Sequence, residues 1–337
     1  MGWQEEITEL TTRGKLSELM GGTEKVERQH HFGKLTIRER IDAITDLGSF
    51  REIGKLAGVG QYDDEGHLTG FTPSNFVFGT ADLEGRPVMV SGDDFTVRGG
   101  SADASIAGKR QQAEGLALEL KLPHVRLVDG MGGGGSVKTI ETAGRTYIPR
   151  VAGWDTIVNH LAVAPSVSLA LGSVAGIGAA RVTTAHYSVI VKDTAQMMIA
   201  GPALVDWARL GEVSKEELGA SRIHTRNGSI DDEATSEAEA FSLAKKFLSY
   251  LPSNVDQLPP RTVCKDPATR TAPELLEIVP RDPRKVYKMR KIIDAVIDTG
   301  TFFEIGRQWG KSIITGLARL DGVAVAVFAE DPMIYGG

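Results

Sequence analysis

Residues 125–136 read V-R-L-V-D-G-M-G-G-G-G-S, and this stretch decides the fold. Its apolar residues Val125, Leu127 and Val128 are typical of a short buried strand that ends at Asp129. The glycine-rich loop that follows lets the backbone approach a ligand, because glycine has no Cβ and adopts positive φ. A strand that ends in such a loop and continues into a helix directs several N–H groups at one point. We therefore predict a site for an anionic oxygen of a phosphate, a carboxylate or a thioester enolate. A flexible surface linker is the alternative.

A similar loop follows about 40 residues later. Residues 172–180 read G-S-V-A-G-I-G-A-A and come after an apolar strand at residues 167–171. The recurring order of strand, loop and helix predicts a largely parallel sheet covered by helices. This second loop and the turn that follows the next strand add five candidate ligand-binding residues: Ala175, Gly176, Gly178, Gly201 and Pro202.

The composition is that of an ordinary globular protein. The chain of 337 residues has a formal net charge of −6 and no run of lysine and arginine, which argues against nucleic acid and an anionic membrane as partners. Cys264 is the only cysteine, so the sequence carries no disulfide framework or thiolate metal site. No apolar run reaches the roughly 18 residues of a membrane span, and residues 1–11 are unlike a signal peptide. We expect a soluble, cytoplasmic protein.

Helical patterns and proline content divide the chain into four parts. Residues 1–34 are a polar helical lead-in, and residues 35–257 form a first unit with predicted helices at residues 35–46, 104–120 and 236–251. Residues 258–284 contain six of the 14 prolines and form a predicted linker. Residues 285–337 then begin a second unit.

The second unit repeats the first. Residues 41–54 read I-D-A-I-T-D-L-G-S-F-R-E-I-G and residues 293–306 read I-D-A-V-I-D-T-G-T-F-F-E-I-G, with nine of fourteen positions identical. The offset falls from 252 (293 − 41) to 237 (322 − 85), which places 15 extra residues around residues 61–74 of the first copy. The second copy stops before any counterpart of the glycine-rich loops, and we expect it to be incomplete.

Several motifs carry a family resemblance. They are L-T-I-R-E-R-I-D at 35–42, G-S-F-R-E-I at 48–53, F-T-V-R-G-G-S at 95–101, M-I-A-G-P at 198–202 and L-S-Y-L-P-S-N at 248–254. In these motifs the chain resembles the carboxyltransferase (β) subunit of biotin-dependent acyl-CoA carboxylases, which is built from two crotonase-like halves. The resemblance implies an α/β, crotonase-like (ClpP/crotonase) ββα superhelix with one complete half and the start of a second.

The resemblance also implies a chemistry. A carboxyl group passes from carboxybiotin to the α-carbon of an acyl-CoA, and loop N–H groups stabilise the thioester enolate. The family motif maps this role first onto Gly132 and Gly133 and next onto Gly134, with Gly130, Gly135 and Ser136 in the same loop. Released biotin takes the α-proton, so no side-chain base is required. The implied partners are a biotin carboxylase/biotin carrier (α) subunit and further β subunits in a hexamer, with no metal in this subunit.

Three other functions stay open at this point. Gly130-x-Gly132-x-x-Gly135 matches a dinucleotide fingerprint with Asp155 twenty residues later, although the sequence that follows is a poor helix start. A biotin-dependent acyl-CoA decarboxylase component would use the same loops. A non-catalytic assembly subunit would bind CoA without turnover. The isolated histidines, including His124 and His160, have no metal-ligand spacing and are interpreted as structural.

Overall fold

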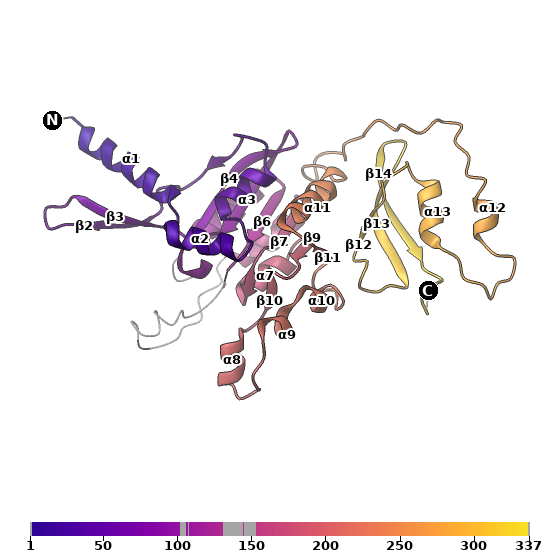
Figure 1. The fold of residues 1–337 in the computed structure, drawn as a ribbon. Coiled ribbons are helices and arrows are strands. Elements are labelled where there is room, and N and C mark those ends of the chain that lie inside the picture. The colour runs from indigo at the N-terminus through magenta and orange to yellow at the C-terminus, as the bar shows by residue number, and fades with distance from the viewer. Residues whose placement is uncertain (1, 102–105, 107, 131–143, 145–152, 336–337) are drawn as a thin grey trace.

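A seven-stranded mixed sheet forms the centre of the computed structural model (Figure 1). The structure describes residues 2–101, 106, 108–130, 144 and 153–335. The strand order is β1-β4-β5-β6-β7-β9-β11. Antiparallel pairing joins β1, β4 and β5, and parallel pairing joins β5 through β11. The strands are β1 (Arg51–Glu52), β4 (Phe76–Leu83), β5 (Arg86–Asp93), β6 (His124–Val128), β7 (Ser166–Ala170), β9 (Tyr187–Val191) and β11 (Asp232–Ala234). The expected parallel arrangement is confirmed from β5 onward.

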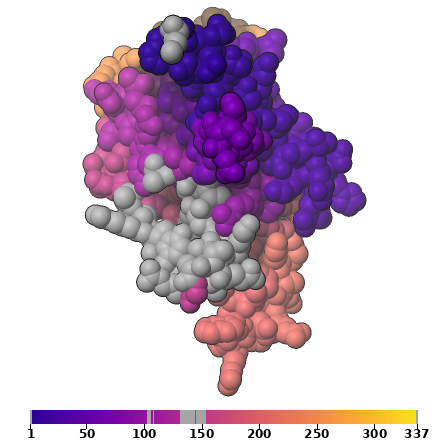
Figure 2. Space-filling view, turned by 90° about the vertical axis from the view of Figure 1, so that its left-hand side faces the viewer, coloured from indigo at the N-terminus to yellow at the C-terminus, as the bar shows by residue number. Residues whose placement is uncertain are grey.

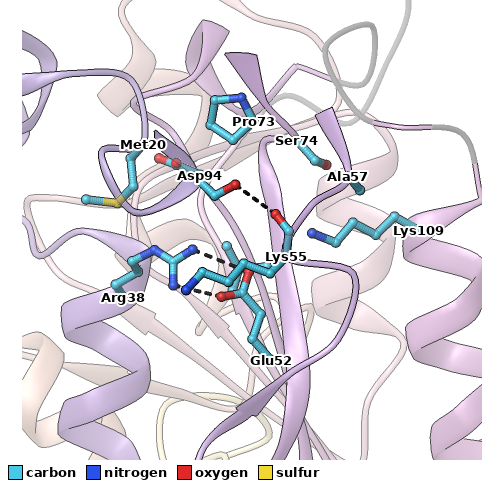
Figure 3. Close-up of a pocket in the computed structure, with 11 residues that line it drawn as sticks. Met20, Arg38, Glu52, Lys55, Ala57, Pro73, Ser74, Asp94 and Lys109 are labelled. Atoms are coloured by element: carbon cyan, nitrogen blue, oxygen red, sulfur yellow. Dashed lines mark hydrogen bonds and ion pairs between the residues drawn. The ribbon is translucent and has the colours of Figure 1, made fainter. Parts of the chain in front are cut away.

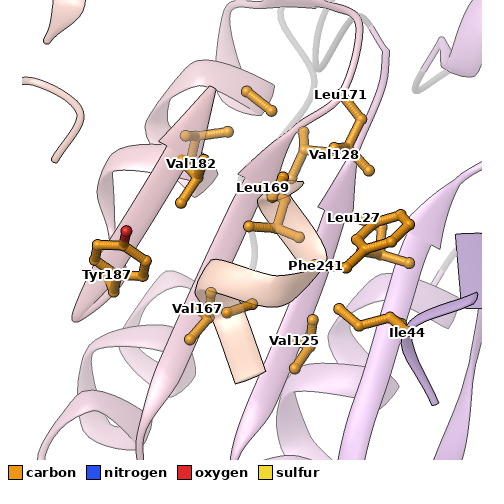
Figure 4. Packing of buried hydrophobic residues seen from close by; sticks show 14 of the residues in the cluster. Ile44, Val125, Leu127, Val128, Val167, Leu169, Leu171, Val182, Tyr187 and Phe241 are labelled. Atoms are coloured by element: carbon orange, nitrogen blue, oxygen red, sulfur yellow. The ribbon is translucent and has the colours of Figure 1, made fainter. Parts of the chain in front are cut away.

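Strand β6 has two chemically different faces, both buried. Val125 and Leu127 point toward helices α3 (Ile37–Ile44) and α11 (Glu237–Ser249) and join the main apolar core. Figure 4 shows this packing, with Phe241 of α11 and Ile44 of α3 set against the strands. His124 and Arg126 point to the opposite face, which α4 (Lys109–Glu119) covers. The sheet is therefore closed on both sides, as a parallel sheet requires.

Helix α4 begins later than the sequence pattern predicts. The expected helix spanned residues 104–120, but the observed one begins at Lys109. Gly108 directly before it has a φ of 83°, which is left-handed and cannot continue a right-handed helix. The predicted boundary was wrong there for that reason. Helix α6 (Trp154–Leu161) packs against α4 on the same side of the sheet.

Two segments extend from this body (Figure 1). The first combines α1 (Gln4–Glu18) with the hairpin of β2 (Gly58–Tyr62) and β3 (Leu68–Pro73), which occupies the position of the predicted 15-residue insertion. The second extending segment comes after strand β10 (Gln196–Met198) in the chain. Strand β10 pairs in parallel with β8 (Ser173–Ala175). The other helices described before α11 are α2 (Thr23–His31), η1 (Arg98–Gly100), α7 (Ile177–Thr183), α8 (Pro202–Trp207), α9 (Lys215–Gly219) and α10 (Ser221–His224).

The C-terminal segment repeats the antiparallel arrangement of strands β1, β4 and β5. A long stretch containing only α12 (Leu275–Ile278) leads to α13 (Met289–Val296) and an antiparallel sheet. Its strands are β12 (Phe303–Ile305), β13 (Ile313–Leu320) and β14 (Val323–Glu330). Within the residues that the structure describes, no helix is both long and apolar enough to cross a membrane.

Side-chain contacts recur at equivalent positions of the two copies. Asp46 accepts the N–H groups of Glu84 and Gly85 at 2.9 and 2.7 Å. Its counterpart Asp298 accepts those of Asp321 and Gly322 at 2.9 and 2.7 Å. The internal repeat inferred from the sequence is therefore a repeat of structure as well.

Candidate functional site

Strand β6 ends at a buried carboxylate held by positive groups. Asp129 has no exposed surface, and its Oδ2 lies 2.8 Å from Nη1 of Arg40, 3.2 Å from Nζ of Lys34 and 3.1 Å from Nε2 of Gln29. Burial alone would raise the pKa of Asp129, but Arg40 and Lys34 outweigh burial and hold that pKa below its ordinary value. Asp129 is thus an ionised anchor directly before the glycine-rich loop.

Arg40 joins this anchor to two other elements. Its Nε and Nη2 donate to the Glu237 carboxylate of α11 at 2.9 and 2.7 Å, and Nη2 also donates to the Leu171 carbonyl at 3.1 Å. The ends of β6 and β7 are therefore tied to α3 and α11. This role of Arg40 is not among the predictions made from the sequence. The available signal was an arginine on the apolar stripe of a helix, one position from Ile41, where a charge is buried only if it is paired.

Glycines permit close approaches around this anchor. A Cβ on Gly172 would lie 1.9 Å from Oδ1 of Asp129. A Cβ on Gly100 would lie 2.8 Å from the Asp129 carbonyl oxygen and 2.9 Å from Cα of Gly130. The F-T-V-R-G-G-S motif and the start of the glycine-rich loop are consequently in backbone contact.

The two predicted loops meet at this point. The N–H of Ala175 donates to the Gly130 carbonyl at 3.4 Å, and the N–H of Gly176, at a φ of 59°, donates to the Met198 carbonyl at 3.0 Å. Gly130 and Gly178 line the same small cavity. The structure thus brings Gly130, Ala175, Gly176 and Gly178 together.

The other predicted site residues are placed differently. Gly201 and Pro202 lie at the beginning of α8, beyond the end of β10. Gly132, Gly133, Gly134, Gly135 and Ser136 lie outside the described residues, so their roles stay predictions.

A basic cleft of about 610 Å³ lies beside the anchor. Among the described residues that line it, five side chains are cationic and one is acidic, and the Nζ of Lys34 lies 4.2 Å from the ring centroid of Phe95. Such a surface suits a ligand that combines phosphate charge with an aromatic or apolar part. Its lining includes Lys25, Arg28, Lys34, Arg98, Lys215, Asp193, Phe32, Phe95, Ser173 and Thr194.

A second, much smaller cavity lies at the base of the hairpin formed by β2 and β3 (Figure 3). Arg38 is directed at Glu52, with Nη1 and Oε2 2.9 Å apart, and Lys109 and Asp94 approach from other elements. Burial lowers the pKa of Lys109 to about 8 and raises that of Asp94. The cavity of about 10 Å³ has room for about one water molecule, so we interpret it as structural.

Paired strands that precede glycine loops, with helices on both faces and a repeated helix–hairpin unit, define an α/β fold of the crotonase-like class. Solved structures confirm this fold. Transcarboxylase 12S, described as a hexamer with methylmalonyl-coenzyme A and methylmalonic acid bound, matches 97% of the chain with a TM-score of 0.80 and 27% identity. A single-chain, multi-domain long-chain acyl-CoA carboxylase matches 98% of it with a TM-score of 0.78 and 26% identity.

The chain belongs to the carboxyl transferase domain family, whose model matches residues 28–337. The propionyl-CoA carboxylase carboxyltransferase subunit of Haloferax mediterranei is 31% identical across the whole chain. The human mitochondrial propionyl-CoA carboxylase β chain is 33% identical over 95% of it. The chain spans 64% and 59% of the lengths of these two relatives. In transcarboxylase 12S it covers 63% of the solved chain. The family resemblance read from the sequence motifs is confirmed.

Proposed function

We propose that this chain takes part in carboxyl transfer between carboxybiotin and the α-carbon of an acyl-CoA. The observation that carries the proposal is the junction of Gly130 with Ala175 and Gly178 at the ends of adjacent parallel strands. Gly178 lies in the first turn of α7, where backbone N–H groups have no partner within the helix, and such groups are suited to a thioester enolate, whose negative charge develops during the reaction.

The basic cleft supports an acyl-CoA as the ligand. CoA carries several phosphate charges, and the cleft is lined by Lys25 and Arg28 of α2, by Lys215 of α9 and by Lys34, which is paired with Asp129. The cleft and the glycine junction therefore share one anchor, which places a phosphate-binding surface next to the proposed enolate site. These features do not fix the reacting acyl group, because the similar proteins include propionyl-CoA carboxylases and a long-chain acyl-CoA carboxylase.

Partners follow from the family. We propose that carboxybiotin is presented by a biotin-carrying α subunit and that β subunits assemble as a hexamer, as the transcarboxylase 12S structure is described. Exposed apolar side chains on the segment around α8, which extends from the body in Figures 1 and 2, support such an assembly. They are Ile199, Leu204, Trp207 and Leu210. The absence of a metal requirement and a cytoplasmic location are further parts of the proposal.

Binding of CoA can be tested on the cleft. Titration calorimetry of the chain with propionyl-CoA should show binding that weakens with salt. The substitutions Lys25→Ser and Arg28→Ser should each weaken it several-fold, because each removes a phosphate contact. Lys291→Ser, an exposed lysine on α13, is the matched control and should leave affinity unchanged. Equal affinities for all variants would contradict the placement of CoA.

Transfer itself requires the partner. With a biotin-carrying subunit and propionyl-CoA supplied, Gly132→Val and Gly133→Val should lower turnover by a factor of about 10²–10³ while CoA still binds. Tight CoA binding without any transfer by the unmodified chain would favour the assembly-subunit alternative. Release of CO₂ from a malonyl-type thioester as the only reaction would favour the decarboxylase.

A further inference from the structure

The face of the sheet opposite the apolar core carries a buried charged cluster. Arg126 donates through Nε and Nη2 to the Glu114 carboxylate at 2.9 and 2.8 Å. Arg110 donates through Nη2 to Asp93 at 2.8 Å. Arg181 lies between these pairs, with its guanidinium nitrogens 3.8 Å from Asp93 and 3.7 Å from Glu114.

This cluster has more positive than negative charge. Three arginines face two carboxylates, and a histidine that contacts the cluster does not change the balance. His124 lies 3.2 Å from Glu114 and 2.8 Å from the Ser91 hydroxyl, and burial lowers its pKa to about 4, so its ring is neutral near pH 7. Among the described residues, the cluster therefore holds one uncompensated positive charge. A buried charge of this kind is costly unless an anion pairs with it.

One donor of Arg110 is unsatisfied by the part of the chain that the structure describes. Its Nε is buried and has no hydrogen-bond partner among the residues described. Burial, together with the charge of Arg181, lowers the pKa of Arg110 even though Asp93 acts in the opposite direction. The guanidinium carbons of Arg110 and Arg181 lie 5.3 and 5.5 Å from the ring centroid of Phe76, which holds both groups in place.

A cavity joins these two arginines to the glycine junction. It is lined by Asp93, Gly100, Arg110, Gly130, Ile177, Gly178 and Arg181. Its volume of about 10 Å³ corresponds to a single water-sized oxygen atom. A water molecule would fill this space but leave the excess charge, whereas one carboxylate oxygen would fill it and pair with the guanidinium groups.

We propose that Arg110 and Arg181 bind one carboxylate oxygen of the acyl group when an acyl-CoA occupies the site. The inference rests on the proposed function, because it places the acyl group at the junction of Gly130 and Gly178. Two sources share this chemistry. One is a carboxylate on the α-carbon, next to the thioester, and the other is a carboxylate at the far end of a dicarboxylic acyl chain.

Calorimetry on the full chain distinguishes the sources with three ligands: propionyl-CoA has no carboxylate, methylmalonyl-CoA has one on the α-carbon, and glutaryl-CoA has one at the chain end. We expect one anionic ligand to bind about tenfold or more tightly than propionyl-CoA, as one charge-assisted hydrogen bond provides. Tighter binding of methylmalonyl-CoA assigns the cavity to the α-carboxylate, and tighter binding of glutaryl-CoA assigns it to the carboxylate at the chain end.

Substitutions of Arg110 and Arg181 test whether these two residues bind the carboxylate. Arg110→Met and Arg181→Met should remove most of the preference for the anionic ligand over propionyl-CoA, whereas Arg110→Lys, which retains the charge, should retain part of it. Arg86→Met is the control, since Arg86 donates to the Leu248 and Leu251 carbonyls away from the cavity. Equal binding of the three ligands, or a preference that survives both methionine variants, overturns this inference alone. Failure of all three to bind overturns the proposed function as well.

Discussion

At the scale of single residues, the candidate site depends on charges that have no access to water. Asp129 and Arg40 are both fully buried, and each is satisfied only by the other and by a few neighbours. Breaking such a pair from one side leaves the remaining charge in a low-dielectric interior. The anchor is therefore rigid, and it fixes where the glycine-rich loop begins.

We predict that Arg40→Met destabilises the protein by about 3–5 kcal/mol, because Asp129 and Glu237 lose their shared partner. Urea denaturation measures the loss. Arg38→Met, two positions earlier on α3, is the control. Arg38 pairs with Glu52 but is partly exposed, so its removal should cost about 1 kcal/mol or less. Equal losses would show that the anchor carries no special stability.

The buried His124 makes stability depend on pH. Its pKa of about 4 in the fold is lower than the ordinary 6.5, so the unfolded chain binds a proton more readily than the folded one. Stability should therefore fall as pH decreases from 6.5 toward 4, by up to about 3 kcal/mol. His124→Gln should remove this part of the pH dependence, and His67→Gln, at an exposed position, should leave it. If the free energy of unfolding changed equally with pH between pH 4 and 7 in all three proteins, the prediction would be contradicted.

At the scale of elements, glycine placement ties the loops to the anchor. Gly172→Ala should destabilise the protein by more than 1 kcal/mol, because its Cβ would overlap the Asp129 carboxylate unless the strand end moves. Gly115→Ala on α4 is the matched control. No atom lies within 4 Å of a Cβ there, so alanine should stabilise the helix by about 0.5–1 kcal/mol. Thermal denaturation of both variants measures these changes in stability. A Gly172→Ala variant as stable as the unmodified protein would refute the close approach.

How far the sequence predicted these elements depends on the type of signal. Strand β6 followed from its apolar run, and the repeat of the first unit in the second followed from identities at fixed spacing. The beginning of α4 did not, because the left-handed Gly108 is not distinguishable in sequence from a tolerated helical glycine. The charged cluster around Arg126 was missed as well. Alternating buried charges on a strand acquire partners only through tertiary contacts from α4 and α7.

At the scale of the whole molecule, the second copy is packed onto the first. Phe303 of β12 is buried among Tyr187, Phe247 and Tyr250, with ring centroids 5.5, 6.5 and 6.2 Å away. Arg319 of β13 donates to the Ser249 carbonyl at 2.7 Å and to that of Pro260 at 2.8 Å. The division into two units at the proline-rich segment stays a prediction, but the two sides of that segment share an apolar contact.

The contact between the two copies should survive cleavage of the chain between them. Limited proteolysis should first cut within residues 258–284, where the structure contains only the short α12 between long irregular stretches. The two fragments should nevertheless elute together in gel filtration, because Phe303 and Arg319 hold the second copy against α11 and the end of β9.

Phe303→Ala should separate them or lower the free energy of unfolding by about 3–5 kcal/mol, as large aromatic truncations in a core do. Phe328→Ala on β14, where the side chain is 73% exposed, removes a phenylalanine of the same size and should change neither property. Fragments of the unmodified chain that separate immediately after cleavage would show that this contact does not hold the two copies together.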